Sequence, residues 1–146
     1  ADPEALVQIS HWTTPEGLPK RFATWFFVGS ADATQVRVDG GEIHAHAWLT
    51  PAAALEARRA GEIELPPPTF VTLTTLLETR SAAEAIAAAR AQSPLVYLPR
   101  LVRLEGGACS LYPADAGWET RDPSLEGARH RLLMLDSGWR YLRDPF

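Results

Sequence analysis

The residues best suited to ligand chemistry lie in one apolar segment near the start of the chain, 20–28 (KRFATWFFV). Side chains alternate between the two faces of a strand, so this segment predicts one face that carries Arg21, Trp25 and Phe27. An arginine can pair with a phosphate, and aromatic rings can stack on a base. The pattern is therefore compatible with a binding site for a phosphate-bearing ligand. From spacing alone we favour the alternative, in which both faces belong to the core and Arg21 is a rim residue.

Other chemically capable side chains lack a supporting pattern. His44 and His46 are two residues apart in an alternating segment, 42–48, but a zinc site needs a third and usually a fourth ligand. We favour surface or hydrogen-bonded histidines over a metal site. No base or orienting carboxylate is spaced with Cys109 or with Ser10 in a known nucleophile motif. The sequence therefore predicts no catalytic residue and no metal ligand within this chain.

Length and composition indicate a globular α/β protein. The chain has 146 residues, 46% of them apolar, and a net charge of −4. It has no basic footprint for nucleic acid and no apolar run near the roughly 20 residues of a membrane span. The single cysteine cannot form an internal disulfide. We expect a soluble cytoplasmic protein without nucleic-acid or membrane partners.

The spacing of apolar residues, together with helix start signals and turn residues, predicts the order of helices and strands. Alternating or β-rich segments predict strands, and Thr50-Pro51 and Ser81–Glu84 are helix start signals. Glycine-containing turns predict two hairpins in the last third of the chain. The expected strands are 5–12, 22–29 and 42–48, the expected helices are 51–60, a helix through Phe70–Leu77 and 81–92, and the expected hairpins are 95–104 with 108–112 and 129–135 with 139–143.

Three motifs resemble one family. Trp12-Thr13-Thr14-Pro15, the strand 21–27 and the segment 65–69 (LPPPT) are similar to the second half of Nudix hydrolases, in the subclass of bacterial proteins and peroxisomal coenzyme A diphosphatases. The resemblance is good over about 5–78. It departs from the subclass at Ala23, where relatives typically carry aspartate. The family's box of clustered glutamates is missing, since no two acidic residues are adjacent in this chain.

The resemblance implies a fold, a reaction and further site residues. The fold would be the C-terminal portion of a Nudix-type α/β/α sandwich, with 1–93 as the C-terminal half of the Nudix-like domain and 94–146 as a β-hairpin-rich extension. Pro67, Phe70 and Glu42 would join Arg21, Trp25 and Phe27 at the substrate cleft. The reaction would be cleavage of a diphosphate linkage in a nucleoside diphosphate derivative, with coenzyme A as one candidate.

The missing box leaves the role of the chain open. In the family, box glutamates hold Mg²⁺ or Mn²⁺ and water is the nucleophile. Because the chain opens without an initiating methionine, we expect a fragment boundary, with the box supplied by upstream residues or another chain. The expected partners are a nucleotide-type small molecule and either a missing N-terminal half or a second copy. The alternative is a non-catalytic nucleotide-binding or interaction module derived from the same fold.

Overall fold

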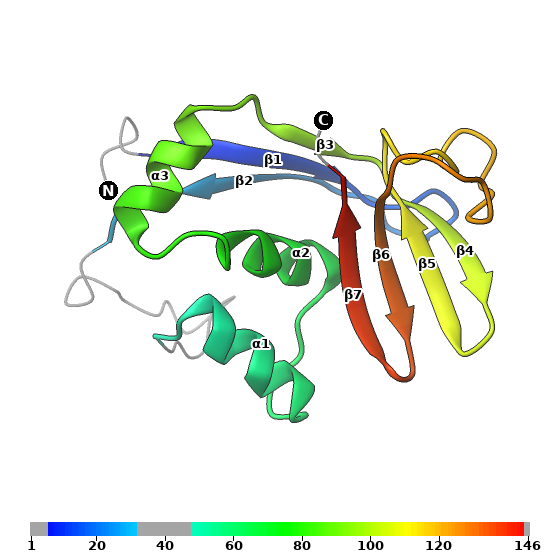
Figure 1. The fold of residues 1–146 in the computed structure, drawn as a ribbon, viewed down its shortest axis with the longest axis horizontal. Coiled ribbons are helices and arrows are strands. Elements are labelled where there is room, and N and C mark those ends of the chain that lie inside the picture. Colours follow the sequence, from blue (N-terminus) through cyan, green and yellow to red (C-terminus); the bar gives the residue numbers. More distant parts are fainter. Residues whose placement is uncertain (1–5, 32–47, 145–146) are drawn as a thin grey trace. The chain divides into compact units, whose positions relative to one another are not determined.

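The computed structural model describes 6–31 and 48–144, and these residues form an α/β fold (Figure 1). The chain divides into two compact units. The helical unit comprises Ala1–Val7 and Phe27–Gln92, and the sheet unit comprises Gln8–Phe26 and Ser93–Phe146. Most of the expected strand 42–48, including His44 and His46, lies outside the described residues. The predicted division of 1–93 from 94–146 stays a prediction.

Among its described residues the helical unit contains three helices, each overlapping an expected helix. They are α1 (Pro51–Arg59), α2 (Pro67–Leu76) and α3 (Ala82–Arg90). Thr50 caps α1 by accepting a hydrogen bond from the Ala53 amide, and Ser81 caps α3 by accepting one from the Glu84 amide. Both predicted caps are confirmed, because each side chain satisfies an amide that the first turn leaves without a partner.

Helix α2 is rich in threonine, and two features keep it helical. Its first residue is Pro67, where a missing amide hydrogen costs nothing and the fixed φ suits a helix. Thr72, Thr74 and Thr75 each donate their hydroxyl to the carbonyl four residues earlier. These bonds satisfy polar groups that would otherwise compete with the helix. The helix contacts α1 and buries Phe70 and Val71.

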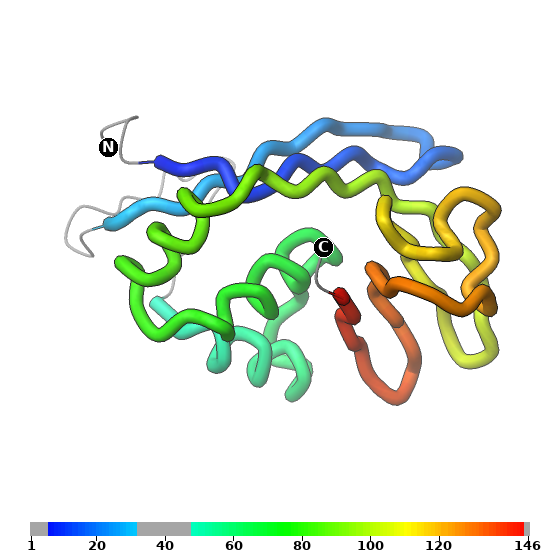
Figure 2. Tube along the Cα trace, turned by 45° about the horizontal axis from the view of Figure 1, so that its top comes forward, coloured from blue at the N-terminus to red at the C-terminus, as the bar shows by residue number. Residues whose placement is uncertain are grey.

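The described residues of the sheet unit form two sheets. Figure 2 follows the path of the chain through them. The first has the strand order β2-β1-β3, from β1 (Val7–Thr13), β2 (Ala23–Val28) and β3 (Leu95–Tyr97). Strand β3 runs parallel to β1, with Ser10 opposite Leu95 and Trp12 opposite Tyr97. The second sheet is an antiparallel meander in the order β4-β5-β6-β7. Its strands are β4 (Arg100–Leu104), β5 (Gly107–Leu111), β6 (His130–Leu135) and β7 (Gly138–Arg143).

The meander confirms both predicted hairpins but corrects the extent of one. The segment 95–104 was predicted as a single strand, whereas the chain leaves the first sheet after Tyr97 and enters the second at Arg100. Pro99 lies between the two strands. Proline has no amide hydrogen to donate to a ladder, so a strand is readily interrupted there. The other hairpin, β6 with β7, turns at Asp136-Ser137 as predicted.

Gly107 opens β5 because no larger residue fits. A Cβ at this position would lie 2.1 Å from the Met134 carbonyl oxygen on the neighbouring strand. The glycine therefore permits the close approach of β5 and β6 that lets the meander continue.

Aromatic rings form the core of the sheet unit. The Trp12 ring stacks on Tyr97 with centroids 4.0 Å apart and meets Tyr112 edge-on at 5.4 Å. The edge-on arrangement is one of the favoured geometries of aromatic pairs. Trp12, the first residue of the W-x-T-P motif, is therefore a core residue. The other buried apolar side chains of this unit are Cys109, Leu111 and Leu132.

Candidate functional site

Arg21 lies just before β2 and not within it, which corrects the expected strand boundary. The strand begins at Ala23, so alternation along β2 does not fix the direction of the Arg21 side chain. Its Nε and Nη2 donate to the Thr14 carbonyl oxygen at 3.3 and 3.2 Å. The Phe22 amide donates to the Thr14 hydroxyl at 2.8 Å. Thr14 of the W-x-T-P motif and Arg21 thus hold the two ends of one turn together.

A small cavity of about 130 Å³ opens beside this turn, within the sheet unit. We call it the Arg21–Arg100 cavity. Two arginines from sequence-distant segments line it, together with the indole of Trp118. The remaining lining residues are Thr13, Thr14, Glu16, Leu98 and Pro99.

Arg100 and Trp118 form a rigid wall of this cavity. The Arg100 guanidinium carbon lies 3.8 Å from the centroid of the Trp118 ring, within the range of a cation–π contact. Its Nη1 donates to the carbonyl oxygens of Trp118 and Glu119 at 2.8 and 3.0 Å. The Trp118 indole nitrogen donates to the Leu98 carbonyl at 2.8 Å. These contacts fix both side chains before any ligand arrives.

The other predicted site residues are placed as follows. Trp25 is 53% exposed and stacks on His11, with ring centroids 4.6 Å apart. Phe27 is equally exposed at the far end of β2. In the helical unit Phe70 is buried under the Arg58 guanidinium, and Pro67 opens α2. Glu42 lies outside the described residues. The role of all of these side chains as substrate contacts stays a prediction.

Strand β2 also bears on the expected partner. Within the described residues β2 pairs only with β1, so it forms one edge of its sheet. Trp25 and Phe27 on this strand, and Phe22 just before it, are each more than half exposed. An exposed apolar edge strand is a template for pairing with another chain segment. The expectation of a missing half or a second copy therefore stays open.

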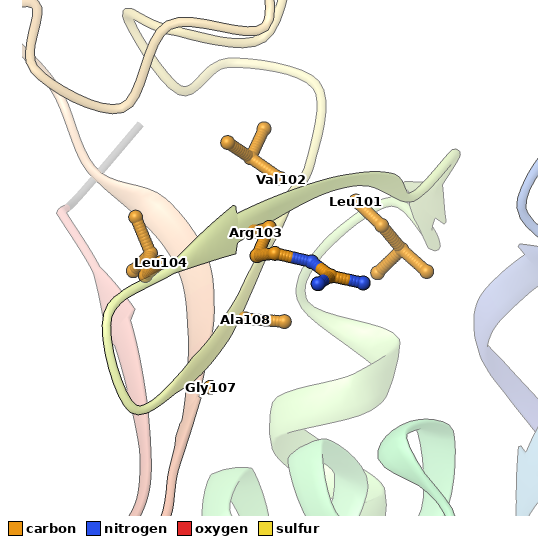
Figure 3. A pocket seen from close by; sticks show the side chains of 6 residues that line it. All are labelled: Leu101, Val102, Arg103, Leu104, Gly107 and Ala108. Carbon is orange, nitrogen blue, oxygen red and sulfur yellow. The ribbon is translucent and has the colours of Figure 1, made fainter.

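A shallower hollow of about 450 Å³ lies over β4 and β5 (Figure 3). Leu101 and Arg103 extend along one side of β4, beside Ala108. Val102, Leu104 and Gly107 complete the lining. Arg103 is the sole charged residue of this set, so the hollow offers no combination of acid, base and nucleophile.

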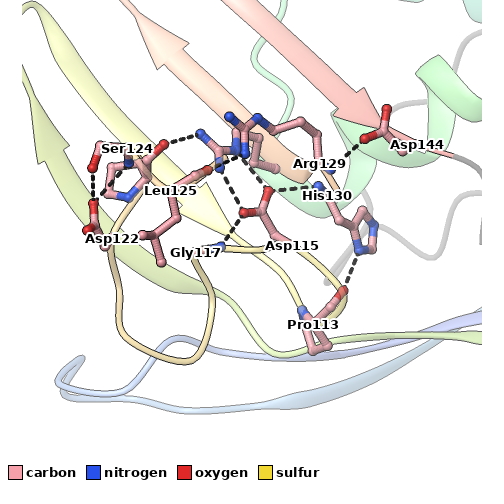
Figure 4. A network of polar contacts seen from close by, with 11 residues as sticks. Pro113, Asp115, Gly117, Asp122, Ser124, Leu125, Arg129, His130 and Asp144 are labelled. Atoms are coloured by element: carbon pink, nitrogen blue, oxygen red, sulfur yellow. Dashed lines mark hydrogen bonds and ion pairs between the residues drawn. The ribbon is translucent and has the colours of Figure 1, made fainter. Parts of the chain in front are cut away.

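A buried polar network holds the loop between β5 and β6 (Figure 4). The Arg131 guanidinium donates to both carboxylate oxygens of Asp115, each at 2.8 Å. The same carboxylate accepts the backbone amides of His130 at 2.7 Å and Gly117 at 2.8 Å. Burial alone would raise the pKa of Asp115, but these four hydrogen bonds outweigh it and hold the pKa below its usual range. Asp115 is therefore an ionised structural anchor.

His130 continues the network towards the aromatic core. Its Nδ1 lies 2.8 Å from the Pro113 carbonyl oxygen, which can only accept, so Nδ1 carries the proton. Its Nε2 then accepts from the Tyr141 hydroxyl at 2.7 Å, and Tyr141 accepts from the Tyr97 hydroxyl at 3.0 Å. Burial lowers the pKa of His130, and the charge of Arg143 acts in the same direction. His130 is therefore a neutral imidazole at neutral pH.

We expect this neutral histidine to make stability pH-dependent. In the unfolded chain the pKa of a histidine is about 6.5. Below that pH the unfolded state binds a proton more readily than the folded state does. Lowering the pH should therefore lower the free energy of unfolding until the folded-state pKa of His130 is passed. Urea unfolding of the protein and of His130→Asn, measured from pH 7.5 downwards, checks this. The difference in slope isolates His130 from the other histidines. Parallel curves for the two proteins would contradict the expectation.

Sequence reasoning missed Arg100, Trp118 and the Asp115–Arg131 pair. The sequence does contain a signal for Arg131, because a charged residue inside the apolar run 130–135 must be either exposed or paired.

The candidate nucleophile and metal ligands remain without a site in the described part of the chain. The buried thiol of Cys109 has a raised pKa, because burial disfavours the thiolate. Among the described residues no three of His, Cys, Asp and Glu cluster as a metal site would require.

Comparison with known proteins gives one distant relative. The chain is 29% identical over 137 residues to the acyl-coenzyme A diphosphatase NUDT19 of Xenopus laevis. This chain therefore resembles part of a Nudix diphosphatase. The alignment takes in 88% of this chain and 36% of the relative, so the chain spans about a third of that protein's length. No family model and no solved structure matches. In the described part of the chain, no helix is long and apolar enough to span a membrane.

Proposed function

We propose that this chain is part of a Nudix-type hydrolase that cleaves a diphosphate linkage in a nucleoside diphosphate derivative, with coenzyme A or an acyl derivative as the leading candidate. The observation that carries the proposal is the similarity to an acyl-coenzyme A diphosphatase along 88% of the chain. It is supported by the motifs at Trp12–Pro15 and 65–69. The chain would supply scaffold and substrate contacts.

The metal ligands of such an enzyme would lie elsewhere. The described residues contain no cluster of three metal-binding side chains. The Asp115 carboxylate is already saturated by four hydrogen bonds, and both of its oxygens face Arg131 or backbone amides. The proposal therefore places the glutamates that hold Mg²⁺ or Mn²⁺ outside the described residues, in an upstream segment or another chain, and assigns no step of the reaction to a metal bound among the described residues.

We expect the 146-residue chain alone to show no hydrolysis of coenzyme A or ADP-ribose in the presence of Mg²⁺. The physical reason is the lack of paired carboxylates, which are needed to hold a divalent ion against a diphosphate. Mass spectrometry of the reaction products is the measurement. Metal-dependent cleavage that co-purifies with the chain would contradict this expectation.

A chimera tests the proposal itself. The region of the Xenopus laevis diphosphatase that matches this chain is replaced by these 146 residues, so that the rest of that protein is kept. We expect the chimera to cleave coenzyme A or an acyl derivative in a metal-dependent manner. A chimera that unfolds cooperatively but does not cleave would overturn the proposal.

The alternative of a non-catalytic binding module is favoured by one observation, the Arg21–Arg100 cavity, which needs no metal to attract an anion. An inactive chimera together with nucleotide binding by the chain alone would favour this alternative.

A further inference from the structure

We propose that the Arg21–Arg100 cavity is a binding subsite for a phosphate group. The assignment of that phosphate to a nucleotide substrate rests on the proposed function, whereas the anion-binding chemistry does not. Arg100 and Trp118, which no motif singled out, would act in it together with Arg21.

Charge distribution is the first support. Arg21 and Arg100 line the cavity, and Glu16 is the one acidic residue of its lining. The Glu16 carboxylate lies 3.6 Å from Nη2 of Arg121, which compensates it. The lining thus carries two cations and one anion, and the anion has a cation of its own in Arg121, on a chain whose net charge is −4. A local positive potential on an acidic protein selects for an anionic ligand.

The donors are already oriented. Arg21 uses Nε and Nη2 on one carbonyl oxygen, and Arg100 uses Nη1 on two. A guanidinium has five N–H groups, so both retain donors after these bonds. Because the side chains are fixed by backbone carbonyls and by the Trp118 ring, little conformational entropy is lost when they bind an oxyanion.

The size of the cavity fits the same ligand class. A volume of about 130 Å³ is several times what one water molecule needs. One tetrahedral phosphate therefore fits. The cavity would hold one phosphate while the rest of the ligand extends beyond it.

Calorimetric titration of the 146-residue chain with inorganic phosphate and with coenzyme A tests the proposal. We expect saturable binding of both that weakens with added salt. Arg21→Ala and Arg100→Ala should each weaken binding about 10- to 100-fold, the effect of losing one charge-assisted hydrogen bond. Arg103→Ala is the matched control, because Arg103 lies on the same strand as Arg100 but lines the other hollow. It should leave binding unchanged.

The outcomes separate the sources of the phosphate. Coenzyme A binding that exceeds phosphate binding and is competed by it identifies a nucleotide-borne phosphate, whereas equal affinities identify free phosphate. If Arg100→Ala unfolds the loop around Trp118, the exposed Arg21 still gives a clean test. A folded chain that binds neither ligand, or binding that both substitutions leave unchanged, would overturn the subsite. An inactive chimera would overturn the proposed function alone, because the titration requires no catalysis.

Discussion

Replacing Asp115 by alanine is expected to lower the free energy of unfolding by about 3–5 kcal/mol, the typical cost of removing one partner from a buried ion pair. The Asp115 side chain is fully buried and that of Arg131 is 7% exposed, so water cannot replace the lost carboxylate. The substitution also leaves the amides of His130 and Gly117 without their acceptor. Urea unfolding at pH 7 is the measurement.

The control for this substitution is Asp136→Ala in the exposed turn between β6 and β7, which should change stability by no more than about 0.5 kcal/mol. The pH dependence gives a second check. Because the folded pKa of Asp115 lies below its unfolded value, its contribution is complete above about pH 4 and is lost as the pH falls through the folded pKa. Asp115→Ala should lack that loss. A cost below about 1 kcal/mol would contradict the assigned role.

Replacing Trp12 by alanine is expected to cost about 3–5 kcal/mol, the range for deleting a buried aromatic side chain. Trp12 is 3% exposed and packs against Tyr97 and Tyr112. Trp25→Ala on the neighbouring strand is the matched control, because that indole is 53% exposed and makes one stacking contact, with His11. We expect it to cost about 1 kcal/mol, in the range for one aromatic pair.

Thermal or urea unfolding of the two tryptophan variants distinguishes a structural from a ligand-binding role for the W-x-T-P motif. If Trp12 were a ligand contact, Trp12→Ala would weaken phosphate or coenzyme A binding and leave stability intact. We expect the reverse pattern, a loss of stability with binding reduced only in proportion to unfolding.

Local signals predicted local structure well. Thr50 and Ser81 marked helix starts because a capping interaction involves neighbours within three residues. The turn at Asp136-Ser137 was readable for the same reason. The break at Pro99 was missed, because a continuous apolar run does not reveal which of two sheets each half will join.

Only part of the candidate site could be predicted from the sequence. Arg21 was visible beside aromatic residues in one segment, but Arg100 and Trp118 come from positions far along the chain and join Arg21 only through tertiary packing. The partner of Arg131 was equally hidden, since Asp115 is sixteen residues away in a loop of turn-type composition. Pairwise contacts of this kind are set by the fold and leave no periodic trace in one sequence.

The parallel pairing of β1 with β3 has a consequence for how the protein is made. Ser10 and Leu95 are partners about 85 residues apart, so β1 leaves the ribosome long before β3 exists. At roughly 5–20 residues per second, several seconds separate the two events. During that time the Trp12 ring lacks Tyr97 and Tyr112, the residues that later bury it. The nascent chain therefore carries β1 without its later partners until synthesis has passed the helices, and chaperone binding to this stretch would matter most in that interval.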